Sequence, residues 1–401
     1  MFLYKRKLDL NVRIAIDNRP NDKFRVLIKY KKFQENIIKK ISSYSGDFIN
    51  KIDNCNIVTA MLNARGIKRI IEYPEVESIS FDEYLFVCGT SVLTANKLRL
   101  NTSNELSGCG VTVAIIDTGV YPHNDLTTPI NRIVKFVDLI NGSNFPYDDN
   151  GHGTAIAGVI AGNGSKSSNL YRGVAKEANI ISYKAFDETG KGYISDILFS
   201  MESIINEKEQ TNVKIICMPF ETLNSNIFIE NLFYKIASIA KDNNILCILP
   251  SGSNKNLDGS IKGIALSEDC LTVSGYNSSK NSNCYTYSSV GSAKKSVKPN
   301  ISAACVNVVT LNSNVSYVSE KNGNKLYPPP LLTSYKSYTG TSIACAYIAG
   351  ICALLYETNK DLTIKDILSL LELASDELDS PKHHQGFGKF NINKIKKWKV
   401  I

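Results

Sequence analysis

The sequence predicts an α/β protein with a mainly parallel sheet and helices on both faces, preceded by a small α+β domain. From Cys109 onward, near-continuous apolar segments alternate with stretches of helical spacing, which is typical of a parallel sheet covered on both faces. The first ~90 residues instead show shorter strand and helix patterns, which favour a separate small domain. A chain of 401 residues is long enough for two or three domains.

The small domain is expected over residues 1–88. Its predicted strands are 24–30, 56–63 and 78–84, and its predicted helices are 35–46 and 66–76. Two strand–helix halves of this kind make a compact α+β unit. The stretch 89–108, rich in Asn, Ser, Thr and Leu, is expected to be a linker to the large domain.

The large domain is expected over residues 109–401. Its predicted strands are 111–116, 180–186, 213–218, 245–249 and 270–276. Its predicted helices are 152–162, 194–207, 229–242 and 342–359. The last segment is apolar nearly all round, which predicts a central buried helix.

Composition excludes several classes of partner. The net charge of +8 is modest and carries no nucleic-acid-binding signature, so we expect a solvated basic surface. No segment approaches the ~18 consecutive apolar residues of a membrane span, and no secretory signal peptide is visible. Cys217, Cys247 and Cys352 lie in apolar runs and are predicted to be buried free thiols. We expect a cytoplasmic or intracellular protein without a membrane partner, with secretion left open.

Three short motifs carry the candidate chemistry. Asp117 ends an apolar strand in AIIDTGV, His152 begins a helix in NGHGTAIAG, and Ser342 begins the buried helix in YTGTSIACAYIAG. Each motif alone is weak, because an Asp at a strand end or a Ser before a helix is often only a cap. His152 has more weight because the chain has only four histidines, and His123, near a proline turn, is expected at the surface.

Together the three side chains suit nucleophilic catalysis. A serine hydroxyl needs a base within hydrogen-bond reach, and the base needs a carboxylate that holds its tautomer. Gly151 and Gly153 are expected to let a substrate backbone approach the imidazole, and the helix N-terminus at Ser342 directs N–H groups at a developing oxyanion. An aspartic protease is the alternative raised by Asp-Thr-Gly, but it needs two such motifs and leaves His152 and Ser342 unexplained.

With its motifs in the order Asp, His, Ser, the chain resembles the subtilisin-like serine proteases (peptidase S8) over residues 24–390. The resemblance implies a three-layer sandwich and a serine endopeptidase with Asp117, His152 and Ser342 as its catalytic triad. It implies protein or peptide substrates and no required cofactor. It also implies that residues 1–88 are a propeptide, an intramolecular inhibitor removed by self-processing between residues 83 and 107.

Of two substrate-facing segments, one departs from the family pattern and one keeps it. By the resemblance, the predicted substrate-binding residues are Gly190, Lys191, Gly192, Pro219, Phe220, Glu221, Ser251 and Gly252. Where the family has Ser-Leu-Gly-Gly beside the S1 pocket, this chain has Pro-Phe-Glu-Thr, which adds bulk and removes an N–H group. The opposite strand, 188–193, keeps two glycines, so a substrate is expected to add there as an antiparallel strand.

The oxyanion turn also departs from the family, whose donor is the Asn of Ala-Ala-Gly-Asn. Aligned on Gly252, that position is Ser253, and Asn254 follows it. The shorter Ser253 hydroxyl is expected to reach an oxyanion poorly, whereas a one-residue slip presents Asn254. Loss of such a donor costs a factor of about 10²–10³ in turnover, so we expect a slow or narrowly specific protease. The alternative is a weak or inactive pseudoprotease that binds peptides as a regulatory protein, for example in spore germination.

The sequence leaves the metal content open. The family commonly holds calcium near an aspartate like Asp125, but the loop after the His152 helix supplies Asn163 and Asn169 and no carboxylate. Calcium takes several oxygen ligands, usually including carboxylates. A polar loop without a metal is therefore the better interpretation, with calcium as the alternative.

Overall fold

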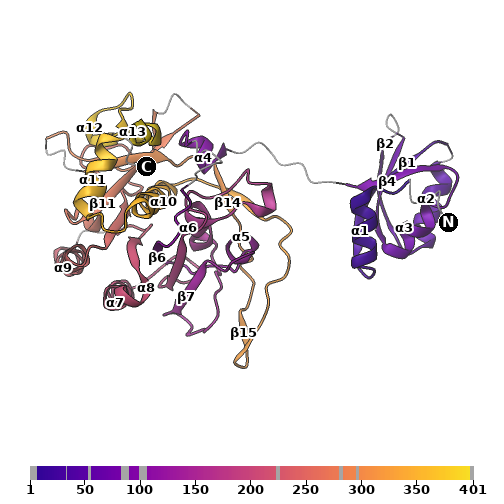
Figure 1. Ribbon diagram of the computed structural model, residues 1–401, viewed down its shortest axis with the longest axis horizontal. Helices are drawn as coiled ribbons and strands as arrows, with labels where there is room; N and C mark the ends of the chain where they lie inside the picture. The colour runs from indigo at the N-terminus through magenta and orange to yellow at the C-terminus, as the bar shows by residue number, and fades with distance from the viewer. Residues whose placement is uncertain are drawn as a thin grey trace. The chain divides into compact units, whose positions relative to one another are not determined.

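The computed structural model describes residues 7–32, 34–52, 56–82, 90–98, 106–222, 226–279, 283–294 and 298–397. The chain divides into two compact units, which we name the N-terminal unit (1–87) and the C-terminal unit (88–401). Figure 1 labels their helices and several of their strands. Each unit has a hydrophobic core of its own.

The N-terminal unit is a four-stranded antiparallel sheet with helices. Its elements are α1 (Leu10–Asn18), β1 (Lys23–Tyr30), α2 (Gln34–Ser43), β2 (Asp47–Ile52), β3 (Ile57–Asn63), α3 (Ala64–Ile70) and β4 (Val76–Phe81). The sheet order is β2-β3-β1-β4. After α1, the succession β-α-β-β-α-β is the ferredoxin-like arrangement.

Two elements of this unit were missing from the sequence prediction. Helix α1 buries Val12, Ala15 and Ile16, a spacing of three and four residues that indicates one helix face. Asp9 caps the helix by accepting the Asn11 N–H at 2.8 Å. Strand β2 is exposed along nearly its whole length, so it lacks the alternation that identifies a half-buried strand.

The C-terminal unit is built on a mainly parallel sheet, which confirms the predicted fold class. Its order is β18-β19-β13-β11-β10-β9-β6-β8-β7, with β12 paired to β11. The strands of this sheet are β6 (Thr112–Asp117), β7 (Ile133–Asp138), β8 (Asn179–Lys184), β9 (Val213–Cys217), β10 (Leu246–Pro250), β11 (Cys270–Asn277), β12 (Asn283–Cys284), β13 (Ile301–Ala304), β18 (Ser375–Asp376) and β19 (Lys389–Phe390). The smaller sheets contain β5 (Thr90–Ser91), β14 (Val308–Leu311), β15 (Glu320–Lys321), β16 (Asn324–Lys325) and β17 (Tyr335–Tyr338).

Helices cover both faces of the sheet (Figure 1). The helices of the C-terminal unit are α4 (Val92–Ala95), α5 (Asn124–Thr127), α6 (His152–Ala161), α7 (Ile194–Asn206), α8 (Lys208–Thr211), α9 (Ile227–Asp242), α10 (Thr341–Thr358), α11 (Ile364–Leu373), α12 (Lys382–Gln385) and α13 (Ile392–Lys397). On β10, Leu246 and Ile248 join the core that contains α6 and α10, whereas Cys247 and Leu249 join the core that contains α7 and α9. Alternate side chains of a strand point to opposite faces, so a strand covered on both sides is apolar throughout.

Helix α10 is the buried central helix that the sequence predicts. By length and composition it could cross a membrane, but 83% of its apolar window is buried inside the unit, as in a core helix. The predicted buried thiols at Cys217, Cys247 and Cys352 are confirmed, and all three cysteines are free.

Residues 90–98, expected to belong to the linker, are instead part of the C-terminal unit. Strand β5 pairs with β14, and Val92, Ala95 and Leu98 are buried in the main core. The Asn96 side chain accepts the Ala304 N–H at 2.8 Å. Residues 83–89 and 99–105, which hold most of the rest of the predicted linker and processing region, lie outside the described residues.

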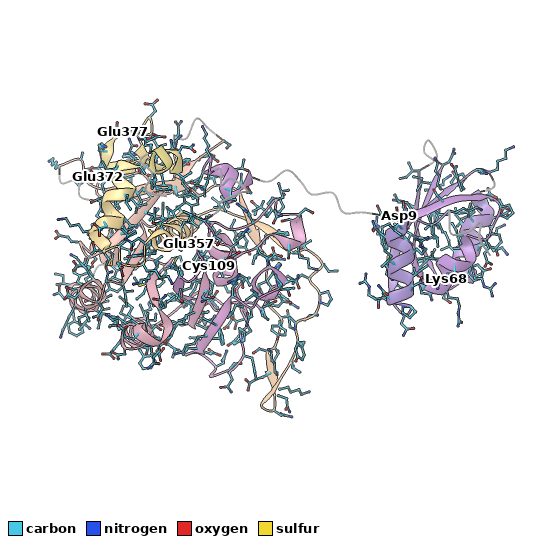
Figure 2. All side chains as sticks on the ribbon, in the orientation of Figure 1. Asp9, Lys68, Cys109, Glu357, Glu372 and Glu377 are labelled. Carbon is cyan, nitrogen blue, oxygen red and sulfur yellow. The ribbon has the colours of Figure 1, made fainter. Side chains whose placement is uncertain are left out.

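Ser107 and Gly108 are anchored to the C-terminal unit by a carboxylate. Glu357, near the end of α10, accepts the N–H groups of Ser107 and Gly108, each at 2.7 Å. Figure 2 labels Glu357 close to Cys109. This carboxylate therefore fixes the backbone just before β6.

Candidate active site

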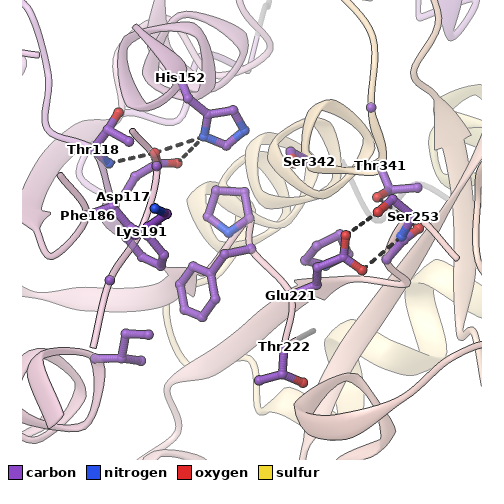
Figure 3. Close-up of a pocket in the computed structure, with 18 of the residues that line it drawn as sticks. Asp117, Thr118, His152, Phe186, Lys191, Glu221, Thr222, Ser253, Thr341 and Ser342 are labelled. Carbon is purple, nitrogen blue, oxygen red and sulfur yellow. Dashed lines mark hydrogen bonds and ion pairs between the residues drawn. The ribbon is translucent and has the colours of Figure 1, made fainter. Parts of the chain in front are cut away.

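A cavity of about 800 Å³ lies where β6, β9 and β10 end and α6 and α10 begin. The carboxyl edge of a parallel sheet is where α/β proteins build their sites. Asp117, His152 and Ser342 all line this cavity, and Figure 3 shows them around it. The structure thus brings together the three side chains that the sequence singled out.

Asp117 and His152 form a close pair. Asp117 ends β6 and is 3% exposed, and His152 is the first residue of α6. The His152 Nδ1 atom lies 2.8 Å from each carboxylate oxygen of Asp117. Because an ionised carboxylate can only accept, Nδ1 donates and Nε2 is left as an acceptor on the other side of the ring.

The environment of His152 favours its protonated form. Burial lowers the pKa of the imidazole, but the charge of Asp117 and its hydrogen bond raise the pKa by more, so the net direction is upward. The more distant charge of Asp148 acts in the same direction. The pair can therefore take up a proton on Nε2 and stabilise the imidazolium that results.

Ser342 is the second residue of α10 and is partly exposed to the cavity. An N–H group in the first turn of a helix has no partner within the helix, so the Ser342 N–H is available to an anion. The neighbouring Thr341 hydroxyl lies 3.4 Å from the Gly252 carbonyl oxygen, which ties the start of α10 to the turn after β10. Within the described part of the chain, no hydrogen bond joins Ser342 to His152; such bonds often tighten only when substrate binds.

Asp148 holds the turn before His152, and the sequence analysis did not identify it. Its buried carboxylate accepts the N–H groups of Gly151 at 2.7 Å and Thr154 at 2.8 Å. It also accepts the hydroxyls of Thr154 at 2.6 Å and Thr118 at 2.9 Å. Burial raises the pKa of Asp148 although the hydrogen bonds of Thr154 and Gly151 lower it. The DDNGHGT spacing was the available signal, since Asp148 stands four residues before His152.

Lys184 is a second positioning group that sequence reasoning missed. It is fully buried at the end of β8, beside Asp117 in the sheet. Its Nζ donates to Asp149 Oδ1 at 2.6 Å and to the carbonyl oxygens of Thr118 and Phe186 at 2.8 and 3.0 Å. One lysine therefore joins the segment after Asp117, the turn before His152 and the start of the 187–193 segment.

Gly153 has a different reason for being glycine from the one expected. A Cβ atom there would lie 2.1 Å from the Gly119 carbonyl oxygen and 3.2 Å from the Asp117 Cβ. Gly153 therefore allows α6 to pack closely against the segment after β6, rather than giving a substrate access to the imidazole. Gly151 has a φ of +99°, which only glycine adopts readily.

Most of the predicted substrate-binding residues line the cavity. They are Gly190, Lys191, Gly192, Pro219, Phe220, Glu221 and Gly252. Ser251 differs: it is buried, and its hydroxyl lies 3.1 Å from that of Ser288. The expected strand at 188–193 is a turn followed by irregular backbone. Asp187 closes the turn by accepting the N–H groups of Thr189 and Lys191 at 2.8 and 3.0 Å.

The two oxyanion candidates point in different directions. Ser253 lines the cavity, but its N–H donates to Glu221 Oε2 at 2.9 Å and its hydroxyl donates to Glu221 Oε1. The Asn254 amide is directed to the Ser260 carbonyl oxygen at 3.4 Å, and the Asn254 N–H donates to Ser289 Oγ at 2.8 Å. The slipped turn that would present Asn254 is therefore absent from this part of the described structure.

The surroundings of Asp125 do not fit calcium. Asp125 is fully buried, and its Oδ1 accepts the Ser165 hydroxyl at 2.9 Å and the Lys166 N–H at 3.2 Å. Its Oδ2 accepts the Tyr335 hydroxyl at 2.6 Å. These groups donate hydrogen bonds, whereas calcium needs a shell of acceptor oxygens. Among the described residues, no group of three or more His, Cys, Asp or Glu side chains is arranged to hold a metal.

The expectation that His123 lies at the surface is wrong. His123 is 2% exposed, its Nδ1 accepts the Asp125 N–H at 3.0 Å, and its Nε2 lies 3.0 Å from the Ser334 carbonyl oxygen. Burial lowers the pKa of His123 and outweighs the charge of Asp125. The sequence could not predict this burial because the partner Ser334 lies 211 positions later in the chain.

A buried carboxylate bound to an imidazole, in one cavity with a serine at the start of a helix, is the side-chain set of a serine hydrolase on an α/β fold. Comparison with known proteins agrees. The model of the subtilase family, peptidase S8, matches residues 108–388. The chain therefore belongs to the subtilase family and is a subtilisin-like serine endopeptidase, which confirms the resemblance seen in the sequence.

Individual relatives cover most of the chain. Serine protease AprX of Bacillus subtilis (strain 168) is 34% identical over 305 residues, which cover 73% of this chain and 67% of AprX. Subtilisin E of the same strain is 24% identical over 359 residues, which cover 88% of this chain and 84% of subtilisin E. The solved structure of sphericase aligns with a TM-score of 0.62 at 21% identity, covering 76% of this chain and 98% of sphericase.

Proposed function

We propose that the chain hydrolyses peptide bonds through Asp117, His152 and Ser342, and that it is made as a self-processing zymogen. The observation that carries the proposal is the contact of His152 Nδ1 with both carboxylate oxygens of Asp117, 2.8 Å each, in the cavity that Ser342 also lines. This contact leaves the Nε2 atom of His152 as the free base.

The steps follow from the chemistry of the three groups. Ser342 Oγ attacks the scissile carbonyl carbon while His152 Nε2 takes the hydroxyl proton. The tetrahedral intermediate collapses, and the imidazolium gives this proton to the leaving amine. Water then attacks the acyl-enzyme with His152 again as base, which regenerates the Ser342 hydroxyl. Asp117 holds the tautomer and stabilises the imidazolium throughout.

The oxyanion is assigned chiefly to the Ser342 N–H at the N-terminus of α10. Ser253 is the side chain at the cavity, but its hydrogen is directed to Glu221. The loss of one side-chain donor in such a site lowers turnover by about 10²–10³. We therefore expect a working but slow endopeptidase when Ser253 stays bound to Glu221.

The N-terminal unit is assigned as the propeptide and intramolecular inhibitor. Its β-α-β-β-α-β order and its separate core support a unit that folds as a piece. The substrates are assigned as proteins or peptides. The matching relatives AprX and subtilisin E are proteases, which favours this function over a pseudoprotease.

The test compares wild type with Ser342→Ala. We expect wild type to cleave itself between residues 83 and 107 and to digest a denatured protein substrate, and Ser342→Ala to remain full-length and inactive. N-terminal sequencing locates the cut. Glu372→Gln, on the exposed surface of α11, is the control and should process like wild type. A wild type that stays full-length and digests nothing would favour the pseudoprotease instead.

A further inference from the structure

We propose that Glu221 selects substrates with a cationic side chain at P1, the residue on the amino side of the scissile bond, and that this pairing frees Ser253 for the oxyanion. The inference rests on the proposed function and names its substrate class. With this pairing, the oxyanion site is complete only when the preferred substrate is bound.

The Glu221 carboxylate lies in the wall of the cavity. Glu221 lines the same cavity as Ser342, and its Oε2 lies against Gly252, 2.6 Å from where a Cβ atom of that residue would be. Figure 3 shows Glu221 bonded to Ser253 on the side of the cavity where Thr341 and Ser342 lie. Its negative charge is thus held in the wall of the cavity beside the nucleophile.

Ser253 is bound to Glu221 by two hydrogen bonds. Glu221 accepts both of its hydrogen-bond donors, the N–H and the hydroxyl. A serine hydroxyl has a single hydrogen, so it cannot donate to Glu221 and to an oxyanion at once. The Ser253 hydroxyl is therefore withheld from catalysis while it stays on Glu221.

The cavity has apolar walls beside the Glu221 carboxylate. Its walls include Phe186, Phe220, Ile194, Ile197, Ile229 and Ile264, which suit the aliphatic stem of a lysine or arginine. Thr222, next to Glu221, has a buried hydroxyl oxygen without a hydrogen-bond partner. Lys191 is the one lysine among the described residues that line the cavity, and Figure 3 shows it on the side away from Glu221.

A cationic P1 side chain and the Ser253 hydroxyl would compete for the Glu221 carboxylate. The Ser253 hydroxyl is a neutral donor to the carboxylate, whereas an ammonium or guanidinium group adds the attraction of opposite charges to its hydrogen bond. A cationic P1 side chain would take the Glu221 oxygen from Ser253, and the freed hydroxyl would then donate to the oxyanion. Because the oxyanion exists only during reaction, the gain should be in kcat rather than in KM alone.

The experiment uses two peptides that differ only at P1, with lysine or its neutral analogue norleucine. For wild type we expect kcat/KM to favour lysine by about tenfold or more, with part of the preference in kcat. Glu221→Gln should bring the two peptides within about threefold of each other. The control Glu372→Gln should keep the wild-type ratio. A wild-type preference for norleucine, or an unchanged ratio in Glu221→Gln, overturns the selection by Glu221.

Ser253→Ala tests the release of the hydroxyl. It should lower kcat for the lysine peptide by about tenfold, less than the loss of a full-length amide donor, and change kcat for the norleucine peptide by less than about twofold. An equal effect on both peptides, or no effect on either, overturns the release. Ser253→Ala keeps Glu221 in place, so it remains informative if Glu221→Gln folds poorly.

A fluorophosphonate probe separates this inference from the proposed function. The probe reacts with an activated serine and has no P1 side chain. Labelling of Ser342 without a lysine preference would overturn only the role of Glu221. Failure of wild type both to react with the probe and to cleave either peptide would overturn the proposed function and this inference with it.

Discussion

The pairing of Asp117 with His152 sets how the protein should respond to pH. The net effect on the pKa of His152 is upward, because the charge and hydrogen bond of Asp117 exceed the effect of burial. The neutral imidazole is the base, so activity should fall as pH drops through this raised pKa. The fall should therefore come above the ordinary histidine value of about 6.5.

Asp117→Asn should shift this acid limb to lower pH, because the charge that raises the pKa is gone. It should also lower kcat by about 10⁴, since the neutral amide supports the wrong tautomer. The measurement is kcat/KM against pH for both proteins, with Asp269→Asn, in an exposed ion pair with Lys241, as control. An acid limb at the same pH in wild type and Asp117→Asn would contradict the cause assigned to the shift.

The role of a single residue could be predicted where its signal is local in the sequence, and could not where it depends on distant partners. Asp117, His152 and Ser342 could be predicted because each follows a strand end or begins a helix with its own short motif. The roles of Ser253 and Asn254 could not be separated, because they depend on Glu221 and on Ser260 and Ser289. Glu221 is 32 positions from Ser253 in the sequence, so no local pattern shows that the two are bonded.

At the scale of elements, the buried lysine on β8 connects three segments of the site. Lys184 is fully buried, whereas its partner Asp149 is 21% exposed. Lys184→Met should lower the free energy of unfolding by about 3 kcal/mol, because it leaves a carboxylate and two carbonyl groups without their donor. Urea unfolding measures this change.

Lys241→Met is the matched control, because Lys241 and Asp269 form an exposed pair with side-chain exposures of 49% and 26%. Its cost should be about 0–1 kcal/mol. Equal losses in the two lysine variants would show that Lys184 does not hold the three segments together.

The loop after α6 should be stabilised by hydrogen bonds instead of calcium. Tyr335→Phe removes the hydroxyl that donates to Asp125 at 2.6 Å and should cost about 1–3 kcal/mol, since a buried carboxylate oxygen loses its partner. Tyr327→Phe, at a side chain that is 82% exposed, should cost little. In thermal unfolding of wild type, calcium and a chelator should give the same midpoint. A higher midpoint with calcium that Asp125→Asn abolishes would contradict this account.

The elements that the sequence predicts best are those covered on both faces. Strands β6, β9 and β10 and helix α10 are apolar along most of their length, so their burial is visible in the sequence. Strand β2 could not be predicted because its exposed residues carry no alternation. The turn at 188–193 could not be told from a strand, because its form depends on the side chain of Asp187.

At the scale of the whole molecule, the core of the C-terminal unit limits where processing can occur. Val92, Ala95 and Leu98 are buried in that core, and each buried valine or leucine contributes about 1.5–3 kcal/mol. A cut after residue 98 would separate these side chains from the mature protein. We therefore expect self-cleavage within residues 83–89, and N-terminal sequencing of the mature form checks this. A mature form that begins within residues 99–107 would contradict the prediction.

The two-part organisation follows from the sequence, but its boundary does not. The composition of 89–108 is that of a linker, and its apolar residues are too few to announce a buried segment. Pairing of β5 with β14, more than 200 positions later in the chain, is what makes residues 90–98 part of the large core. Long-range pairing of this kind has no signal in local composition.

The central claim is that Ser342 is a nucleophile activated by His152 and Asp117. The most direct measurement is labelling of wild type with a fluorophosphonate, followed by peptide mapping of the modified residue. The account predicts one label, on Ser342, strongly reduced in His152→Ala and absent in Ser342→Ala. A label on another residue, or a wild type that takes up none, would contradict it.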